Sequence, residues 1–106
     1  MKNNDAVSIL SALAQETRLD IFRLLVRAGN AGLAAGAIGQ ALGIPAATLS
    51  FHLKELKHAD TVSCRREGRS LIYSANFATM NALVAFLTEN CCQGVAAEEP
   101  SQPVCC

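Results

Sequence analysis

Two pairs of adjacent cysteines near the end of the chain are the residues best suited to chemistry. Their thiolates are soft ligands that select thiophilic ions. Trivalent arsenic and antimony prefer three sulfur atoms in a pyramid, which one adjacent pair and one further thiol can supply. Zinc prefers four well-spread ligands, usually with Cys-x-x-Cys spacing. The pattern therefore favours arsenite, or antimonite, as an ion bound by Cys91, Cys92, Cys105 and Cys106.

Three other interpretations of these thiols stay open. Adjacent cysteines can form disulfides on oxidation, which would make a redox switch. Other soft metal ions, such as cadmium, zinc or lead, could occupy the same thiols. A thiol enzyme is less favoured, because neither His52 nor His58 is close to a thiol in the sequence and Cys91-Cys92 lacks a phosphate-cradling loop. We therefore expect no catalytic residues and no required cofactor.

Basic side chains concentrate in the middle of the chain although the formal net charge is zero. Within residues 43–75 five basic residues face three acidic ones, whereas residues 76–106 hold three acids and no base. This asymmetry favours a nucleic-acid surface in the middle of the chain. The five basic residues are Lys54, Lys57, Arg65, Arg66 and Arg69.

The composition is that of one small globular domain, with 106 residues of which 51% are hydrophobic and 17% are charged. A chain of this size buries a modest core and gains from dimerisation. No apolar run approaches the ~20 residues of a membrane span, and the first residues lack the apolar core of a signal peptide. An odd number of cysteines without an export signal also argues against a disulfide framework. We expect a cytoplasmic protein that makes no membrane contact.

Apolar periodicity and turn residues predict the order helix, helix, helix, helix, hairpin, helix, tail. In the first helix, over residues 6–13, Val7, Leu10 and Leu13 form a stripe. Thr17, with Asp20 three residues on, is typical of a capping box that starts the second helix. The remaining elements are a helix over 34–42 that ends at Gly43, a helix over 46–59 with Pro45 in its first turn, a hairpin over 61–74 that turns at Gly68, and a helix over 77–90.

A short helix, a three-residue break and a second helix with a polar outer face form a helix-turn-helix. In the second of these helices Leu49, Leu53 and Leu56 fall on one stripe. Together with the arginine-tipped hairpin, this predicts a mainly α protein with a small β-hairpin, a winged helix-turn-helix of order α-α-α-α-β-β-α. The outer face of the second helix carries Thr48, Ser50, Phe51, His52, Lys54 and Lys57.

Three ordered blocks resemble the arsenic- and metal-responsive ArsR/SmtB family of winged helix-turn-helix repressors. The blocks are ETRLDIFRLL at 16–25, TLSFHLKEL at 48–56, and RREGR at 65–69 running on to Tyr73-Ser74. The resemblance implies a homodimer that holds operator DNA when ligand-free and releases it when a toxic ion binds. We expect residues 1–90 to form the DNA-binding and dimerisation domain and residues 91–106 to form a cysteine-containing tail.

Two departures from the family pattern direct attention to the C-terminal cysteines. Some arsenic-sensing members carry Cys-x-Cys at the start of the first helix of the DNA-binding pair, where this chain has Ala34-Ala35-Gly36-Ala37. Zinc-sensing members use Asp and His on the last helix, and residues 77–90 contain neither. A smaller departure is Asp60, which stands where the family usually has Gly after the recognition helix. Asp tolerates the left-handed backbone conformation better than most residues do.

A recognition helix fits the major groove, where base edges offer distinct donors and acceptors. Thr48, Ser50 and His52 are therefore candidates to read or position bases, and the ring of Phe51 to touch a thymine methyl group. An alternative for His52 is packing on the neighbouring helix. Phosphate contacts are expected from two lysines of the helix and from the wing arginines, which could also enter the minor groove. These residues are Lys54, Lys57, Arg65, Arg66 and Arg69.

The apolar stripes of the first and last helices would remain partly uncovered by a four-helix core. They predict a two-fold homodimer, and a two-fold dimer implies an inverted-repeat operator in double-stranded DNA. Arsenite bound at the end of the last helix would tie that end to the tail. We expect this to bias the dimer toward an arrangement that no longer matches the operator.

Overall fold

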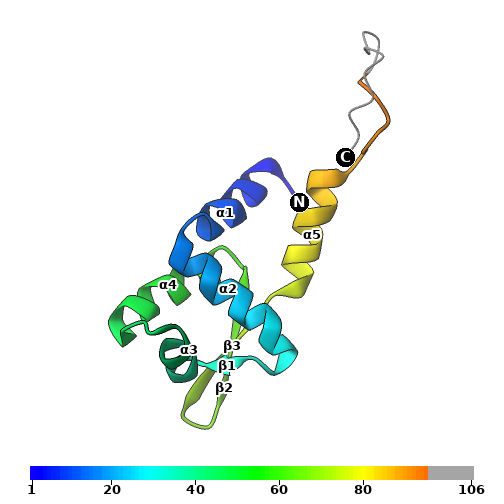
Figure 1. Cartoon of the computed structure of the whole chain (residues 1–106). Helices are drawn as coiled ribbons and strands as arrows, with labels where there is room; N and C mark the ends of the chain where they lie inside the picture. The colour runs from blue at the N-terminus through cyan, green and yellow to red at the C-terminus, as the bar shows by residue number, and fades with distance from the viewer. Residues whose placement is uncertain (96–106) are drawn as a thin grey trace.

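Residues 1–95 fold as five helices and a small antiparallel sheet, with the β2–β3 hairpin extending as a wing (Figure 1). The computed structural model describes residues 1–95. The fold class expected from the sequence is thereby confirmed, with one additional strand, β1. In chain order the elements are α1 (Asn3–Leu13), α2 (Glu16–Ala28), the 3-10 turn η1 (Gly29–Ala31), β1 (Leu33–Ala34), α3 (Ala35–Leu42), α4 (Ala46–His58), β2 (Val62–Glu67), β3 (Ser70–Ala75) and α5 (Phe77–Thr88).

The sheet has the strand order β1-β3-β2, and both pairs are antiparallel. The unexpected strand β1 has only two residues, which is too short for an alternating pattern, and Leu33 pairs with Tyr73. Gly32 precedes it with a φ of +68°, and a Cβ at this position would collide with the carbonyl oxygen of Tyr73. A glycine is therefore needed where the chain enters the sheet.

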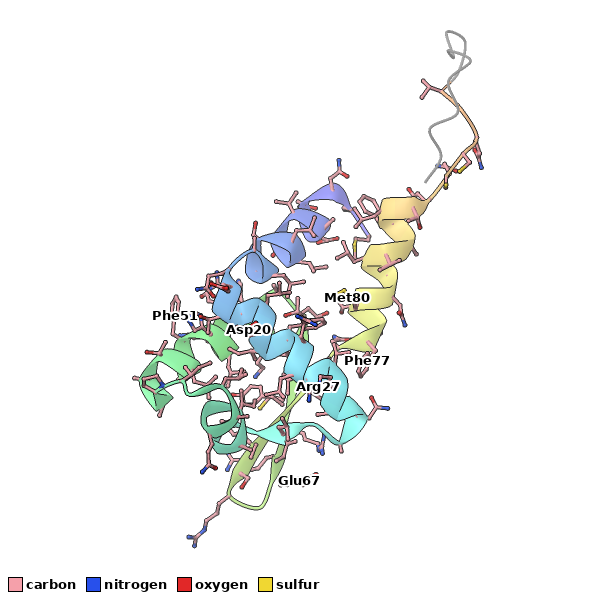
Figure 2. The ribbon with its side chains drawn as sticks, in the orientation of Figure 1. Asp20, Arg27, Phe51, Glu67, Phe77 and Met80 are labelled. Atoms are coloured by element: carbon pink, nitrogen blue, oxygen red, sulfur yellow. The ribbon has the colours of Figure 1, made fainter. Side chains whose placement is uncertain are left out.

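The interior is divided into two hydrophobic clusters. The smaller one joins α1 to α5 through Ala6, Ile9 and Leu83. Leu13 and Met80 are partly buried and pack against both clusters, so they connect them (Figure 2). The main core joins α2, α3, α4 and the sheet, and includes Ile21, Phe22, Leu25, Ile38, Leu49, Leu53, Leu56 and Val62.

Turn residues end the elements largely where the sequence predicts. Gly43 caps α3 in the left-handed conformation, and Gly68 has a φ of +63° at the first position of the two-residue hairpin turn. A positive φ at this position suits the primed turns that match the twist of paired strands. Asp60 also adopts a left-handed φ of +63° after α4, as expected for this residue.

Several expected helix starts were wrong in detail, and α1 begins at Asn3, three residues before the predicted start. The side chain that caps α2 belongs to Gln15, whose Oε1 accepts a hydrogen bond from the backbone N–H of Arg18 at 2.9 Å. The helix therefore begins at Glu16, before the predicted Thr17 start. Pro45 is the N-cap of α4, one residue ahead of the first turn that was predicted for it. Its fixed φ fits this extended position as well as the helix itself.

Within residues 1–95, every helix is too short or too polar to cross a bilayer.

The main core depends on Leu56, which is fully buried between α4 and the elements around it. We expect Leu56→Ala to lower the free energy of unfolding by about 2–5 kcal/mol, because it removes buried methyl groups and leaves a cavity. Leu19→Ala is the matched control, since Leu19 is 42% exposed and its truncation should cost only about 0.5 kcal/mol. Urea denaturation at a fixed protein concentration measures both values, and equal losses would contradict the assigned core.

Candidate nucleic-acid interface

The helix α4 presents an exposed polar face along its length. The leucines of its apolar stripe are buried, as predicted, with at most 3% of each side chain exposed. Phe51 is 56% exposed and lies at the edge of the molecule in Figure 2. This face combines hydroxyl, aromatic and ammonium groups, which can contact base edges and phosphates. The exposed members of the predicted set are Thr48, Ser50, Phe51, Lys54 and Lys57.

The predicted placement of His52 on this outer face was wrong. His52 is only 8% exposed, and its Nδ1 lies 3.4 Å from Nη1 of Arg18 on α2. Because a guanidinium group only donates, this Nδ1 is the acceptor of the pair. The alternative of packing on a neighbouring helix therefore describes His52. The signal was present in the sequence, because His52 completes the i, i+3, i+4, i+7 stripe of Leu49, Leu53 and Leu56.

The buried His52 supports the exposed Phe51 beside it. The two rings meet edge to face, with centroids 5.5 Å apart and an interplanar angle of 61°. Arg18 in turn donates from Nε to the carbonyl oxygen of Ala12 at 2.7 Å, which joins the end of α1 to α4. His52 thus orients the recognition surface, whereas the sequence suggested that it would form part of that surface.

The hairpin formed by β2 and β3 carries its basic residues close to a two-residue turn. Glu67 pairs with Ser70 across the turn, which contains Gly68 and Arg69. Arg66 and Arg69 are exposed there. Figure 1 shows α3, α4 and the hairpin at the end of the molecule that lies away from the C-terminal end of α5. A helix and a basic wing at one end can grip a duplex together.

Arg65 has a structural role that the sequence did not indicate. Its Nη2 donates to the carbonyl oxygen of Ala31 at 2.8 Å, its Nη1 donates to that of Asn30, and its Nε donates to Glu67 at 2.8 Å. The guanidinium group therefore holds the wing against the turn after α2. The expected phosphate contact from Arg65 stays a prediction, because its side chain is still 44% exposed beside these contacts.

Cys64 lies in β2, directly opposite Tyr73 of β3. Burial raises the pKa of Tyr73, and hydrogen bonding and electrostatic interaction with Cys64 add to the rise. The phenol therefore stays protonated at neutral pH and acts as a structural group of the sheet.

The predicted ion site is only partly described by the structure. Cys91 and Cys92 are exposed just beyond α5, and the N–H of Cys91 bonds to the carbonyl oxygen of Thr88. Cys92 is disulfide-bonded, so one of the C-terminal thiols that the sequence offers as ion ligands is oxidised here. Cys105 and Cys106 lie outside the described residues. Among residues 1–95, no three Cys, His, Asp or Glu side chains converge on a metal position.

Sequence comparison connects the chain to transcriptional regulators. The helix-turn-helix domain family matches residues 13–64, which run from the end of α1 to β2. An uncharacterized helix-turn-helix-type transcriptional regulator of Bacillus subtilis, YceK, is 34% identical over 73 residues. The match covers 66% of this chain and 72% of that relative. The region that the family matches contains the whole of α4.

Comparison with solved structures leads to the same class of protein. An ArsR-like transcriptional regulator from a Rhodococcus species superposes with a TM-score of 0.71 at 27% identity, over 79% of this chain and 76% of its own. A homodimeric winged helix-turn-helix DNA-binding domain from Mycobacterium bovis, described as a possible ArsR-family transcriptional regulator, gives a TM-score of 0.67 at 29% identity. That match covers 80% of this chain and 77% of the other. Both superpositions extend over most of the described fold.

Proposed function

Because this chain belongs to the helix-turn-helix-type transcriptional regulators and is similar to an ArsR-like structure, we propose that it is a homodimeric, DNA-binding repressor of the ArsR family that trivalent arsenic releases from its operator. The single observation that carries the DNA half is the exposed face of α4 beside a basic wing. The release half rests on the chemistry of the four C-terminal cysteines. We place the protein in the cytoplasm, where operator DNA is found.

The recognition helix α4 enters the major groove in this proposal. Thr48 and Ser50 read or position bases through their hydroxyl groups, and the ring of Phe51 contacts a thymine methyl group. Lys54 and Lys57 bind phosphates, as do Arg66 and Arg69 of the wing. His52 is left out of the contact set because its Nδ1 is used within the fold, whereas Arg65, which also holds the wing, stays an expected phosphate contact.

The dimer forms through the outer faces of α1 and α5. Val7 and Leu10 on α1 are 60% and 44% exposed, and Val84 and Leu87 on α5 are 54% and 58% exposed. A monomer would leave these apolar side chains in water, and a partner that covers them would gain by burying them. The M. bovis structure, which shares the fold, is described as homodimeric. Two recognition helices related by a two-fold axis then match an inverted repeat.

Trivalent arsenic binds Cys91 and Cys92 together with a thiol of Cys105 or Cys106, within one subunit or between two. Antimonite fits the same three-sulfur geometry. The ion needs thiolates, so the disulfide at Cys92 must first be reduced. To move the protein from 99% bound to 99% released, the ion must favour the released state by ~5.5 kcal/mol. Because the ion binds directly beyond α5, its binding energy can shift the position of a helix that belongs to the proposed dimer interface.

We expect Cys91→Ser combined with Cys92→Ser to preserve operator affinity and to abolish release by arsenite. Serine keeps the size of the side chain but cannot act as a soft ligand. The experiment is an operator-shift assay on reduced full-length protein, with arsenite, antimonite, zinc, cadmium and peroxide in separate arms. Cys64→Ser is the matched control, because Cys64 lies in the sheet, and it should release like the unchanged chain.

Equal release of the double variant and the unchanged chain by arsenite would overturn the arsenic proposal. Release by zinc or cadmium alone would replace arsenic with another soft ion.

A redox-sensing repressor is the second candidate, and the disulfide at Cys92 is the observation that favours it. In that case peroxide would release the operator from reduced protein, a thiol reductant would restore binding, and Cys92→Ser would abolish the response. The peroxide arm of the same assay separates the two proposals. A thiol enzyme is disfavoured by the comparisons, since the relatives are transcriptional regulators.

A further inference from the structure

The two hydrophobic clusters divide the protein into a DNA-binding part and a part that would form the dimer. The α1–α5 cluster is held together by Ala6, Ile9 and Leu83, whereas α4 is anchored in the main core. Apolar contacts are non-directional, so packing through Leu13 and Met80 does not by itself fix the angle between the two parts. Hydrogen bonds between the two parts are directional and therefore restrain their relative orientation more strongly.

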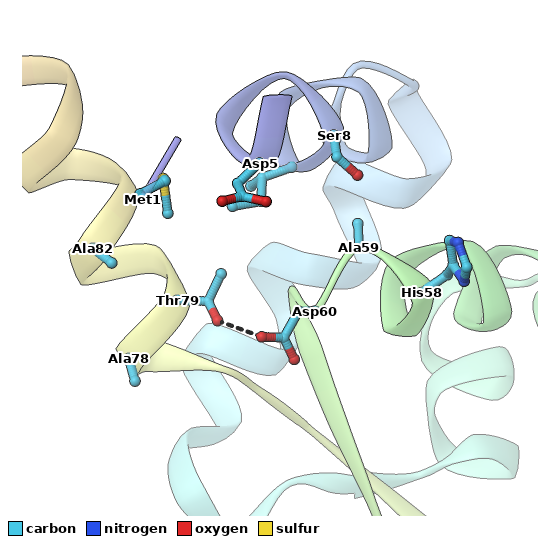
Figure 3. A pocket seen from close by; sticks show the side chains of 10 residues that line it. Met1, Asp5, Ser8, His58, Ala59, Asp60, Ala78, Thr79 and Ala82 are labelled. Carbon is cyan, nitrogen blue, oxygen red and sulfur yellow. Dashed lines mark hydrogen bonds between the residues drawn. The ribbon is translucent and has the colours of Figure 1, made fainter. Parts of the chain in front are cut away.

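Asp60 makes such contacts between the end of α4 and the start of α5. Its Oδ2 accepts a hydrogen bond from Oγ1 of Thr79 at 3.1 Å (Figure 3). Its Oδ1 accepts one from Nδ2 of Asn76 at 3.3 Å. Asn76 is the N-cap of α5, where its own Oδ1 accepts from the N–H of Thr79. Both carboxylate oxygens of Asp60 are therefore used to hold the first turn of α5.

The backbone at Asp60 has a conformation that glycine would adopt more easily. Its φ of +63° lies in the left-handed region, which is unfavourable for residues with a Cβ. The N–H of Asp60 caps α4 through the carbonyl oxygen of Lys57, and glycine would make this contact equally well. The aspartate side chain is thus unnecessary for ending α4, and within residues 1–95 its hydrogen bonds go to Thr79 of α5 and to the N-cap Asn76. A non-glycine residue in this conformation is a reason to look for a functional role.

We propose that Asp60 is a positioning residue that transmits the orientation of α5 to the recognition helix α4. The inference rests on the proposed function, in which α5 belongs to the dimer interface and its C-terminal end responds to the effector. A rotation of α5 moves Thr79 and Asn76, and through Asp60 it moves the end of α4. The two recognition helices of the dimer then change their relative position on the operator.

The hydrogen bonds from Thr79 and Asn76 to Asp60, called the Asp60 link below, are exposed to solvent. They can therefore break and form again reversibly. Asp60 and Thr79 line a cavity of about 480 Å³ between α1, α4 and α5, together with Asp5, Ser8 and His58 (Figure 3). Hydrogen bonds at such a site exchange readily with water. Breaking them is therefore compatible with an intact fold, and their loss is expected to alter orientation more than stability.

Asp60→Gly tests the Asp60 link, because it removes the carboxylate and relieves the left-handed backbone. We expect the variant to remain dimeric and to melt at the same or a higher temperature than the unchanged chain, since glycine suits the positive φ. Its operator affinity without effector should fall by roughly 5- to 10-fold, in line with the loss of a few hydrogen bonds. The ratio of operator affinities without and with arsenite should also shrink.

Two further variants separate the Asp60 link from a general structural effect. Thr79→Val removes the partner hydroxyl and should reproduce the fall in affinity, and combining it with Asp60→Gly should add little more. Thr88→Val is the matched control on the same helix, because the hydroxyl of Thr88 donates to the carbonyl oxygen of Val84 within α5. Asp60→Asn keeps a tolerated left-handed residue and an acceptor oxygen, and should restore part of the affinity.

Operator binding by the unchanged chain tells failure of this inference apart from failure of the proposed function. If the unchanged chain binds its operator, and Asp60→Gly and Thr79→Val bind and respond to arsenite as it does, the Asp60 link plays no part and the inference is overturned. A lower melting temperature that accounts for the whole affinity loss would also overturn it. If the unchanged chain itself shows no operator preference, the proposed function fails as well.

Discussion

Replacing Val84 and Leu87 with aspartate together should leave the chain monomeric and lower its operator affinity by at least about 100-fold. Both side chains are more than half exposed on α5. Burying two carboxylates per protomer in an apolar contact is costly without compensating partners. A monomer engages one half-site and loses the effective concentration that links the second recognition helix to the first. Sedimentation equilibrium and fluorescence anisotropy on operator DNA measure the two effects.

The control for this prediction places the same charges on another exposed apolar pair. Leu19 and Val26 of α2 are 42% and 41% exposed, and we expect Leu19→Asp with Val26→Asp to stay dimeric. A Val84 and Leu87 variant that remained dimeric would show that α5 does not form the interface. A monomeric variant with undiminished affinity would show that the operator is bound by single chains.

Replacing Arg66 and Arg69 with alanine together should reduce operator affinity by about 10- to 1000-fold at moderate salt, and should flatten its salt dependence. Each phosphate contact adds about 0.9 to the slope of log affinity against log salt concentration. Two arginines in each of two protomers therefore account for a slope change of about 3 to 4. The effect should be nearly the same for operator and unrelated DNA if the arginines bind phosphates, and larger for operator DNA if they enter a narrow minor groove.

Two controls locate this effect on the wing. Arg23→Ala with Arg27→Ala removes two exposed arginines of α2 and should leave the slope unchanged. Arg65→Ala removes the group that holds the wing to the carbonyl oxygens of Asn30 and Ala31, so its main effect should be on thermal stability. Equal slopes for the unchanged chain and the Arg66 and Arg69 variant would remove the wing from the interface.

The helix-turn-helix and the wing were predictable because local signals and long-range packing agree there. Gly43, Gly68 and the leucine stripe of α4 each specify a conformation that the tertiary structure also requires. The strand β1 was not predictable, because its two extended residues form a strand only by pairing with β3, which is distant in the sequence. The α2 cap was missed since Gln15 is an uncommon capping residue, and the Thr17 pattern satisfied the usual rule.

The candidate interface was predictable in its position on the chain and less so in its individual residues. Helical periodicity separates the buried and exposed faces of α4, but His52 lies at their boundary, and its partner Arg18 comes from a distant part of the sequence. Arg65 looks like its neighbour Arg66 until the carbonyl groups of the turn after α2 are brought beside it. In both cases a long-range contact decides between a structural role and an exposed one. Short-range spacing cannot supply that information.

The measurement that bears most directly on the proposed repressor is a fluorescence anisotropy titration of reduced full-length protein on a duplex selected by the protein from a randomised pool. We expect two protomers per duplex, an inverted repeat in the selected sequence, and an affinity at least about 1000-fold above that for a scrambled duplex. Arsenite added at a few equivalents per protomer should return the anisotropy to that of free DNA. Equal affinity for selected and scrambled duplexes, or selection of no common sequence, would contradict the assignment of α4 and the wing as an operator-reading surface.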